Sequence, residues 1–429
     1  SGCQCGHRGL RTHVCPGLAG AGGGGGLNYV PIPVALLGVG RLIPVDLWSD
    51  TGQLLLRRGQ PLLSEEHREK LHAFNACATE SDTLAWQRAY ERMVHDMLRD
   101  GMDLQSIASA PMPSEIRESD YVVGAQLSGG WLDLQEVLRG ILYQGGLATN
   151  PLQRLAGLGS KVLSLLEADT DDSLLCLFLA LADDTLGYSA THALLCASIC
   201  TLTAEKLGLN AGQRHTLLQG ALTMNIGMAR DQDFLARQVP PPSDWQRNLI
   251  RQHPEISVDI LARYGVDDPD YLDIVRWHHQ PTAPEALPHN YMVRLVLNTA
   301  DAFVAKLAAR KSRAPLSALG AAKSMYVGAQ GDAVAVGSAM ATAVGFYPPG
   351  SFVRLVNGDT AVAVQRGARA NTPWVICIQD KKGLPTSRYQ CRDTQEPEWA
   401  IAAPVNYQTV KVAVSLEKVR RARESIAAG

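Results

Sequence analysis

The pattern of hydrophobic and polar positions changes twice along this chain of 429 residues. Near the N-terminus, two short β-type runs at 45–48 and 53–56 flank a turn sequence at 49–52, which predicts a β-hairpin. From about residue 81 to 346, apolar residues recur every three or four positions, which predicts helices. After Gly350, short β-type runs return around the turn sequence Asn357-Gly358. The pattern therefore predicts a mainly α protein with a small N-terminal β-rich module and a C-terminal β tail.

These changes predict five segments. They are a disordered Gly-rich extension (1–26), a small β-rich module (27–80), a helical connector (81–165), a helical domain (166–346), and a β-hairpin or barrel-like tail with a terminal helix (347–429). Within the tail, residues 410–414 are a candidate further strand.

Cysteines add two candidate features. The extension contains Cys3, Cys5, Cys15, His7 and His13. A zinc knuckle is one interpretation, but the paired C-x₂-C spacing is missing, which favours an unstructured extension. Cys196 and Cys200 lie one helical turn apart on an apolar face, which predicts buried thiols.

Composition and charge argue against several classes of protein. A formal net charge of -2 and a pI near 6.6 argue against a chain built to bind nucleic acid or an acidic membrane. The most apolar run, 173–182, stops at Asp183-Asp184 and is too short to cross a bilayer. No apolar segment of a secretory signal precedes a cleavage site near the N-terminus, so a cytoplasmic location is expected.

The central segment carries the candidate chemistry. Helices are predicted at 189–207 and 211–229, from Ser243 with an interruption at Pro254, from Asp268 toward a histidine pair, and at 289–310. Each of four such helices contains or ends at a candidate metal ligand: His192, His253, His278, His279 and Asp301. A helical bundle builds a metal site in this way, from side chains on several helices that converge on one interior point.

In this order and spacing, the residues resemble the HD-GYP family, bacterial hydrolases of cyclic di-GMP in the HD superfamily. The matching motifs are His192, "HPEIS" at 253–257, the pair His278-His279, Asp301 preceded by Arg294, and "YPPGSFVRL-x-NG" at 347–358. The resemblance covers about 180–365 and implies an HD-superfamily helical bundle. It also implies that the four histidines and Asp301 bind metal and that Arg294 binds substrate.

Two family signatures are missing. Met224 and Asn225 stand where the family has its His-Asp pair, and Met228 stands where it has a lysine. A proline-rich loop at 280–288 replaces the Gly-Tyr-Pro loop. No catalytic residue is therefore assigned.

The loss of the aspartate has an electrostatic consequence. Two divalent ions about 4 Å apart repel by on the order of 20 kcal/mol at an effective dielectric near 20, and a bridging carboxylate offsets part of this. Asn225 is neutral, and the thioether of Met224 is a poor ligand for iron, manganese or magnesium. Three states of the site stay open: a relic without metal, one divalent ion (iron, manganese or zinc), or a full catalytic centre, of which the last is least expected.

The expected function is that of a degenerate HD-GYP-like signalling protein. It would sense cyclic di-GMP or a related nucleotide, or act as a scaffold for bacterial signalling proteins such as diguanylate cyclases, without efficient hydrolysis. The alternative is a metal-dependent cyclic di-GMP phosphodiesterase or phosphohydrolase with residual activity.

Overall fold

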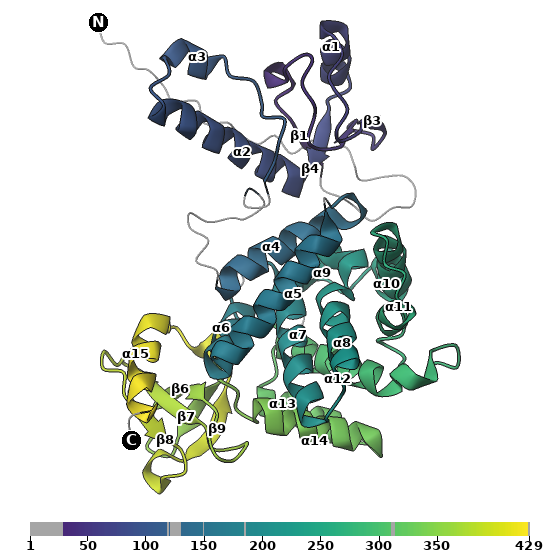
Figure 1. Cartoon of the computed structure of the whole chain (residues 1–429). Coiled ribbons are helices and arrows are strands. Elements are labelled where there is room, and N and C mark those ends of the chain that lie inside the picture. The colour runs from purple at the N-terminus through teal and green to yellow at the C-terminus, as the bar shows by residue number, and fades with distance from the viewer. Residues whose placement is uncertain are drawn as a thin grey trace, which may run out of the picture. The chain divides into compact units, whose positions relative to one another are not determined.

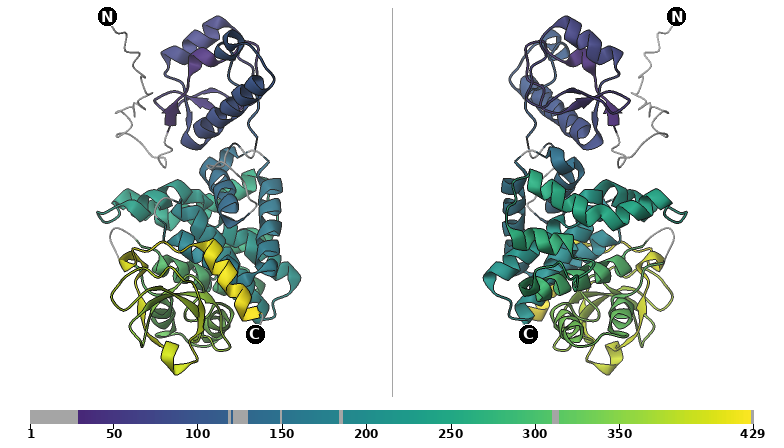
Figure 2. Two further views of the ribbon diagram at one scale, coloured as in Figure 1. Left: turned by 90° about the vertical axis from the view of Figure 1, so that its left-hand side faces the viewer. Right: turned by 90° about the vertical axis from the view of Figure 1, so that its right-hand side faces the viewer.

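The computed structural model describes residues 29–117, 120, 130–148, 150–183, 186–309 and 314–427 (Figure 1, Figure 2). The extension at 1–26 and its cysteines and histidines lie outside these residues. The chain forms two compact units, 1–121 and 122–429. The boundary between them falls inside the predicted connector 81–165, so its first long helix and its later helices belong to different units.

The first unit contains an antiparallel four-stranded sheet in the order β1-β4-β2-β3. Its elements are β1 (Tyr29–Pro31), η1 (Val34–Leu36), β2 (Leu47–Trp48), β3 (Leu54–Leu56), α1 (Glu65–Ala73), β4 (Cys77–Thr79), α2 (Glu80–Arg99) and α3 (Leu104–Ala108). The β2–β3 pair confirms the predicted hairpin. Trp86 on α2 is almost fully buried in the core of this unit, and its indole N–H donates to the Pro113 carbonyl.

The second unit is a helical bundle followed by the β tail. Its helices are α4 (Trp131–Gln144), η3 (Gly145–Leu147), α5 (Pro151–Ala168), α6 (Thr170–Leu181), α7 (Tyr188–Lys206), α8 (Ala211–Thr223), η4 (Ile226–Met228), α9 (Ala229–Arg237), α10 (Asp244–Arg263), α11 (Pro269–Arg276), η5 (Pro288–Asn290), α12 (Tyr291–Leu307), α13 (Ala318–Tyr326) and α14 (Asp332–Val344). Within the described residues, no helix is both long and apolar enough to span a membrane.

Helix α7 forms the centre of the bundle. Every residue from Ser189 to Cys200 is buried, and α7 packs against α4, α6, α8, α9, α12 and α14. Its sequence makes this possible because alanine, serine, threonine and cysteine side chains are small and let neighbouring helices approach on every side. A helix that is apolar all round belongs in a core. His192, on α7, is thereby placed in the interior of the bundle.

The tail is an antiparallel sheet in the order β8-β7-β6-β5-β9, with α15 packed against β6 and β8. Its elements are β5 (Phe352–Leu355), β6 (Thr360–Gln365), β7 (Trp374–Gln379), β8 (Cys391–Asp393), η6 (Pro397–Trp399), β9 (Ile401–Val405), η7 (Tyr407–Thr409) and α15 (Leu416–Ala427). The candidate strand at 410–414 is wrong. The edge of β5 pairs with 401–405, and the Asn406 side chain then caps the turn that ends this strand.

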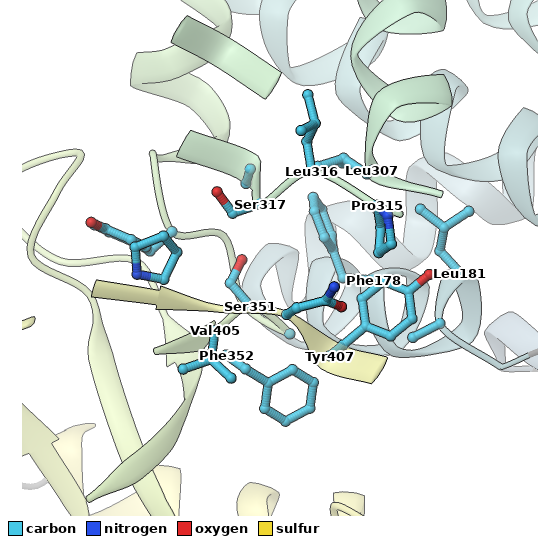
Figure 3. Close-up of a pocket in the computed structure, with 16 residues that line it drawn as sticks. Phe178, Leu181, Leu307, Pro315, Leu316, Ser317, Ser351, Phe352, Val405 and Tyr407 are labelled. Atoms are coloured by element: carbon cyan, nitrogen blue, oxygen red, sulfur yellow. The ribbon is translucent and has the colours of Figure 1, made fainter. Parts of the chain in front are cut away.

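The mainly α architecture with β structure at both ends confirms the predicted fold class. An apolar pocket lies where the helices meet the tail (Figure 3). Phe178 and Leu181 line it from α6, Leu307 from α12, and Phe352 and Tyr407 from the tail. Tyrosines are the only ionisable side chains in its lining, so this pocket is chemically unlike the histidine-rich centre of the bundle.

Candidate metal centre

His253 is oriented by the proline that follows it. Proline has no N–H, so Pro254 leaves the Ile250 carbonyl without its usual helical donor. The Nδ1 of His253 lies 2.7 Å from that carbonyl oxygen and takes the donor's place. The predicted interruption at Pro254 is therefore wrong: α10 runs unbroken from Asp244 to Arg263 with Pro254 inside it. Because a carbonyl can only accept, the proton of neutral His253 sits on Nδ1 and Nε2 carries a lone pair.

His278 is oriented by a helix end in the same way. Helix α11 ends at Arg276, and the last carbonyls of a helix have no partner within it. The Nδ1 of His278 lies 2.7 Å from the Val275 carbonyl oxygen and therefore donates to it. Asn298 on α12 donates to the backbone carbonyl of His278 and fixes the turn beyond the helix. Neutral His278 therefore also presents an unprotonated Nε2.

The two unprotonated nitrogens face each other. His253 Nε2 and His278 Nε2 are 3.3 Å apart, and both side chains are fully buried. Burial and the neighbouring His279 lower the pKa of His253 to about 4. Burial, His279 and His253 lower the pKa of His278 to about 3. Near neutral pH, two lone pairs therefore converge without a proton between them. Two nitrogens bound to one tetrahedral zinc ion at ~2.0–2.1 Å would lie ~3.3–3.4 Å apart, close to this spacing.

His279 and Asp301 complete this side of the centre. The Nδ1 of His279 lies 3.7 Å from Asp301 Oδ2, and its side chain is 43% exposed, so it borders solvent. Ring centroids of His279 lie 4.0 Å from His278 and 5.1 Å from His253. Candidate ligand atoms of the three histidines all lie within 4.8 Å of one another. Burial opposes ionisation of Asp301, but the hydrogen bond from His192 and the nearby histidines outweigh burial and hold its pKa below the usual range.

The fourth predicted histidine lies on the other side of Asp301. His192 Nε2 is 2.8 Å from Asp301 Oδ1, and His192 Nδ1 is 2.9 Å from the Tyr188 hydroxyl. An ionised carboxylate only accepts, so His192 donates from Nε2 and Tyr188 donates to Nδ1. Cys196 Sγ lies 3.4 Å from His192 Nε2. Neither Tyr188 nor Cys196 was a predicted site residue, although both lie one helical turn from His192 in the sequence.

The structure therefore divides the predicted ligands into two groups. The first is His253, His278 and His279, and the second is His192 and Asp301 together with Cys196. Asp301 connects the groups because one carboxylate oxygen faces His192 and the other faces His279.

Met224 and Asn225, which the resemblance sets in place of the family's His-Asp pair, lie against the turn of α10 that carries His253. Met224 and Asn225 are buried. The Ser257 hydroxyl donates to the Met224 carbonyl and accepts from the Gly227 amide. Gly227 packs so closely that a Cβ atom there would lie 2.7 Å from the His253 carbonyl oxygen. The buried Asn225 Oδ1 has no hydrogen-bond partner among the described residues. It is a neutral oxygen that a cation or a water molecule would satisfy.

Arg294 is buried and bonded to groups of its own chain. Its side chain is 2% exposed and pairs with Asp273. Its Nη1 also donates to the Leu287 carbonyl at 2.7 Å, and its Nε donates to the Pro281 carbonyl at 3.1 Å. In this arrangement the guanidinium holds both ends of the loop 280–288. The guanidinium can bind a ligand only if its bonds to Asp273 and to the two loop carbonyls break.

No protein-family model matches the sequence, and no curated protein sequence matches it. A solved structure described as Bd1817, an HDG"Y"P protein from Bdellovibrio bacteriovorus, is similar over 73% of this chain and 98% of that chain. The sequence identity is 16% and the TM-score is 0.37. A likeness at this level concerns the fold at most.

Proposed function

We propose that this protein is a degenerate HD-GYP-like signalling protein that binds a divalent metal ion without hydrolysing cyclic di-GMP efficiently. The metal ligands are His253, His278 and His279, with Asp301 Oδ2 beside them. The observation that carries this proposal is the 3.3 Å approach of two unprotonated imidazole nitrogens in a fully buried site. Two lone pairs at that distance repel each other unless a cation lies between them.

The chain fixes both nitrogens before any ion arrives. Each histidine donates its Nδ1–H to a backbone carbonyl, which is the arrangement that usually orients metal-binding histidines. A donor set of three imidazoles and one carboxylate suits zinc or iron better than magnesium. When bound, such an ion would act as a Lewis acid and an attachment point for a phosphate oxygen. His279 is 43% exposed, so a phosphate would reach the ion past this side chain.

Efficient hydrolysis is not expected because Met224 and Asn225 add no charged group to the metal centre. Met224 and Asn225 are neutral, and Asp301 is the one carboxylate in the two ligand groups. Arg294, which the resemblance assigns to substrate, is already bonded to Asp273 and two loop carbonyls. A bound ion would therefore attract a phosphate, but the residues around it offer little to cleave it.

The ligand class comes from the resemblance to the HD-GYP family. We propose cyclic di-GMP or a related nucleotide, with bacterial signalling proteins such as diguanylate cyclases as partners. Residual phosphodiesterase activity is the second candidate. It is favoured by the solvent-exposed His279 beside Asp301, which leaves one side of the centre accessible to a substrate.

Metal analysis of the purified full chain tests the first step. After growth with zinc, iron and manganese and dialysis, we expect bound metal, and we expect the His278→Ala variant to contain one ion fewer per chain. The matched control is His215→Ala, which removes an exposed histidine on α8. A metal-free wild-type chain would overturn the proposal.

Two further assays separate the candidate functions. Isothermal titration of the metal-loaded chain with cyclic di-GMP measures binding, and production of linear pGpG or GMP measures hydrolysis. We expect binding without appreciable turnover. Turnover that disappears in His253→Ala would favour the enzyme. No affinity for guanine dinucleotides, together with no partner in pull-down experiments, would refute the signalling assignment.

A further inference from the structure

Cys196 lies one helical turn after His192 on α7, so both side chains leave the same face of the helix. Helix α12 packs against this face and brings Asp301 to them. Cys196 Sγ, His192 Nε2 and Asp301 Oδ1 are mutually close, with candidate ligand atoms within 4.8 Å of one another. Cys196 and His192 are almost fully buried, and the Asp301 side chain is 13% exposed. A thiol, an imidazole and a carboxylate therefore share one enclosed point.

The distance between sulfur and nitrogen is close to that of a zinc site, and the distance between nitrogen and oxygen is shorter. With Zn–S ~2.3 Å and Zn–N or Zn–O ~2.0–2.1 Å, a tetrahedral ion separates sulfur from nitrogen by ~3.6 Å and nitrogen from oxygen by ~3.3 Å. The observed distances are 3.4 Å for Cys196 Sγ to His192 Nε2 and 2.8 Å for His192 Nε2 to Asp301 Oδ1. The shorter distance is that of a hydrogen bond, so an ion would take the place of its proton.

Tyr188 provides the outer support that such a ligand needs. Its hydroxyl lies 2.9 Å from His192 Nδ1. When His192 binds an ion through Nε2, its proton moves to Nδ1 and is donated to the Tyr188 oxygen. Histidine ligands of metals nearly always have a partner of this kind on the second nitrogen. The hydroxyl can act in both states because it both donates and accepts.

We propose that His192, Cys196 and Asp301 Oδ1 form a second metal site that takes a zinc ion, with Asp301 shared between the two sites. This goes beyond the proposed function, which involves only the first site, but it uses the same carboxylate. On binding, the Cys196 thiol loses its proton to solvent and the thiolate bonds to zinc, while His192 only exchanges tautomers. One proton is released for each ion bound.

The thiolate explains how two ions could coexist without the aspartate of the family's His-Asp pair. Two divalent ions bring four positive charges, and the Asp301 carboxylate and the Cys196 thiolate together bring two negative ones. Asn225 brings none. A thiolate with an imidazole selects zinc over magnesium or manganese, which prefer oxygen ligands. The second site would hold α7 and α12 together.

Cobalt substitution tests this site directly. Thiolate bound to Co(II) gives a charge-transfer band in the near ultraviolet, which imidazole and carboxylate ligands do not give. We expect the band in the wild-type chain, its loss in Cys196→Ser, and one zinc ion fewer per chain in that variant. The matched control is Cys200→Ser, which changes a buried thiol one turn further along α7 and should keep the band.

Two more variants test the second site independently of Cys196→Ser. If Cys196→Ser does not fold, Tyr188→Phe should retain the band but bind zinc roughly ten-fold more weakly, because it removes the partner of His192 Nδ1. His278→Ala should lose the first ion and keep the band. A wild-type chain without the band, or a band unchanged in Cys196→Ser, would overturn the second site. A band that persists while His278→Ala loses no ion would instead refute the first site.

Discussion

The Arg294→Met variant distinguishes a structural arginine from a ligand-binding one. The change removes the guanidinium that pairs with Asp273 and donates to the Pro281 and Leu287 carbonyls. Asp273 is 5% exposed on its side chain, so its carboxylate would be left buried without its cation. Breaking a buried ion pair by removing one partner typically destabilises a protein by about 3–5 kcal/mol.

The structure places the expected effect near the lower end of that range. Asp273 keeps two other donors after the change, the Leu287 amide at 2.8 Å and the Asn290 side-chain amide at 3.2 Å. They hold part of the negative charge, so we expect a loss of about 3 kcal/mol, which corresponds to a fall in the unfolding temperature of roughly 3–5 °C for a unit of this size. The double variant with Asp273→Asn should recover part of this loss, because a neutral amide no longer needs a cation.

Thermal unfolding of the metal-free chain, followed by circular dichroism, measures the effect. The control is Arg276→Met, which breaks the ion pair between Arg276 and Glu255 at the protein surface. An exposed pair of this kind is worth ~0–1 kcal/mol, so this variant should unfold close to the wild type. The structural role of Arg294 would be refuted if Arg294→Met unfolded with the wild type while losing affinity for cyclic di-GMP.

Two further predictions concern the first metal site. The metal-free protein should lose stability as the pH falls from about 6.5 to 4, because the unfolded chain takes up protons there while His253 and His278, with pKa values of about 4 and about 3, do not. The contribution of His253 alone is about 3 kcal/mol at pH 4. Denaturant titrations at several pH values should show that the free energy of unfolding falls less on acidification in His278→Asn than in the wild type. The exposed control His215→Asn should show the same fall as the wild type. Equal curves for the wild type and both variants would contradict the reasoning. Gly227→Ala should destabilise the chain by about 1–3 kcal/mol and weaken zinc binding, because its Cβ would press on the His253 carbonyl. The control is Gly157→Ala on the exposed side of α5, where the added Cβ meets no other atom and stability should rise by about 0.5–1 kcal/mol. Thermal unfolding and zinc titration compare the two variants. A Gly227→Ala variant as stable as the wild type would exclude the close contact.

Local patterns in the sequence were enough to predict the fold class and many element boundaries. The hairpin around residues 49–52 and the helix starts predicted near 211, Ser243 and Asp268 are confirmed because each depends on residues within a few positions of one another. Helical periodicity likewise depends on one segment at a time. The order of these helices was sufficient to select five polar residues that the structure brings into two adjoining groups.

Features that depend on distant residues could not be predicted. Pro254 was expected to interrupt a helix, but His253 supplies the donor that the proline lacks, and nothing in helix propensity encodes this. Arg294 was assigned by resemblance, whereas its partners are set by how the loop 280–288 folds over α12. The edge strand 401–405 was missed because pairing with β5 selects it over 410–414.

Proton affinities in the centre also favour binding over acid–base chemistry. A general acid or base works best when its pKa lies near the operating pH. Burial of Asp301 opposes its ionisation, but the hydrogen bond from His192 and the charges of the neighbouring histidines together outweigh burial and hold the pKa of this carboxyl group below its usual range. His253 and His278, with pKa values of about 4 and about 3, stay neutral near pH 7. These three groups therefore present lone pairs and one fixed negative charge across the neutral range. That is a good arrangement for holding a cation and a poor one for exchanging protons with a substrate, which is why a centre with its histidines intact need not be a hydrolytic one.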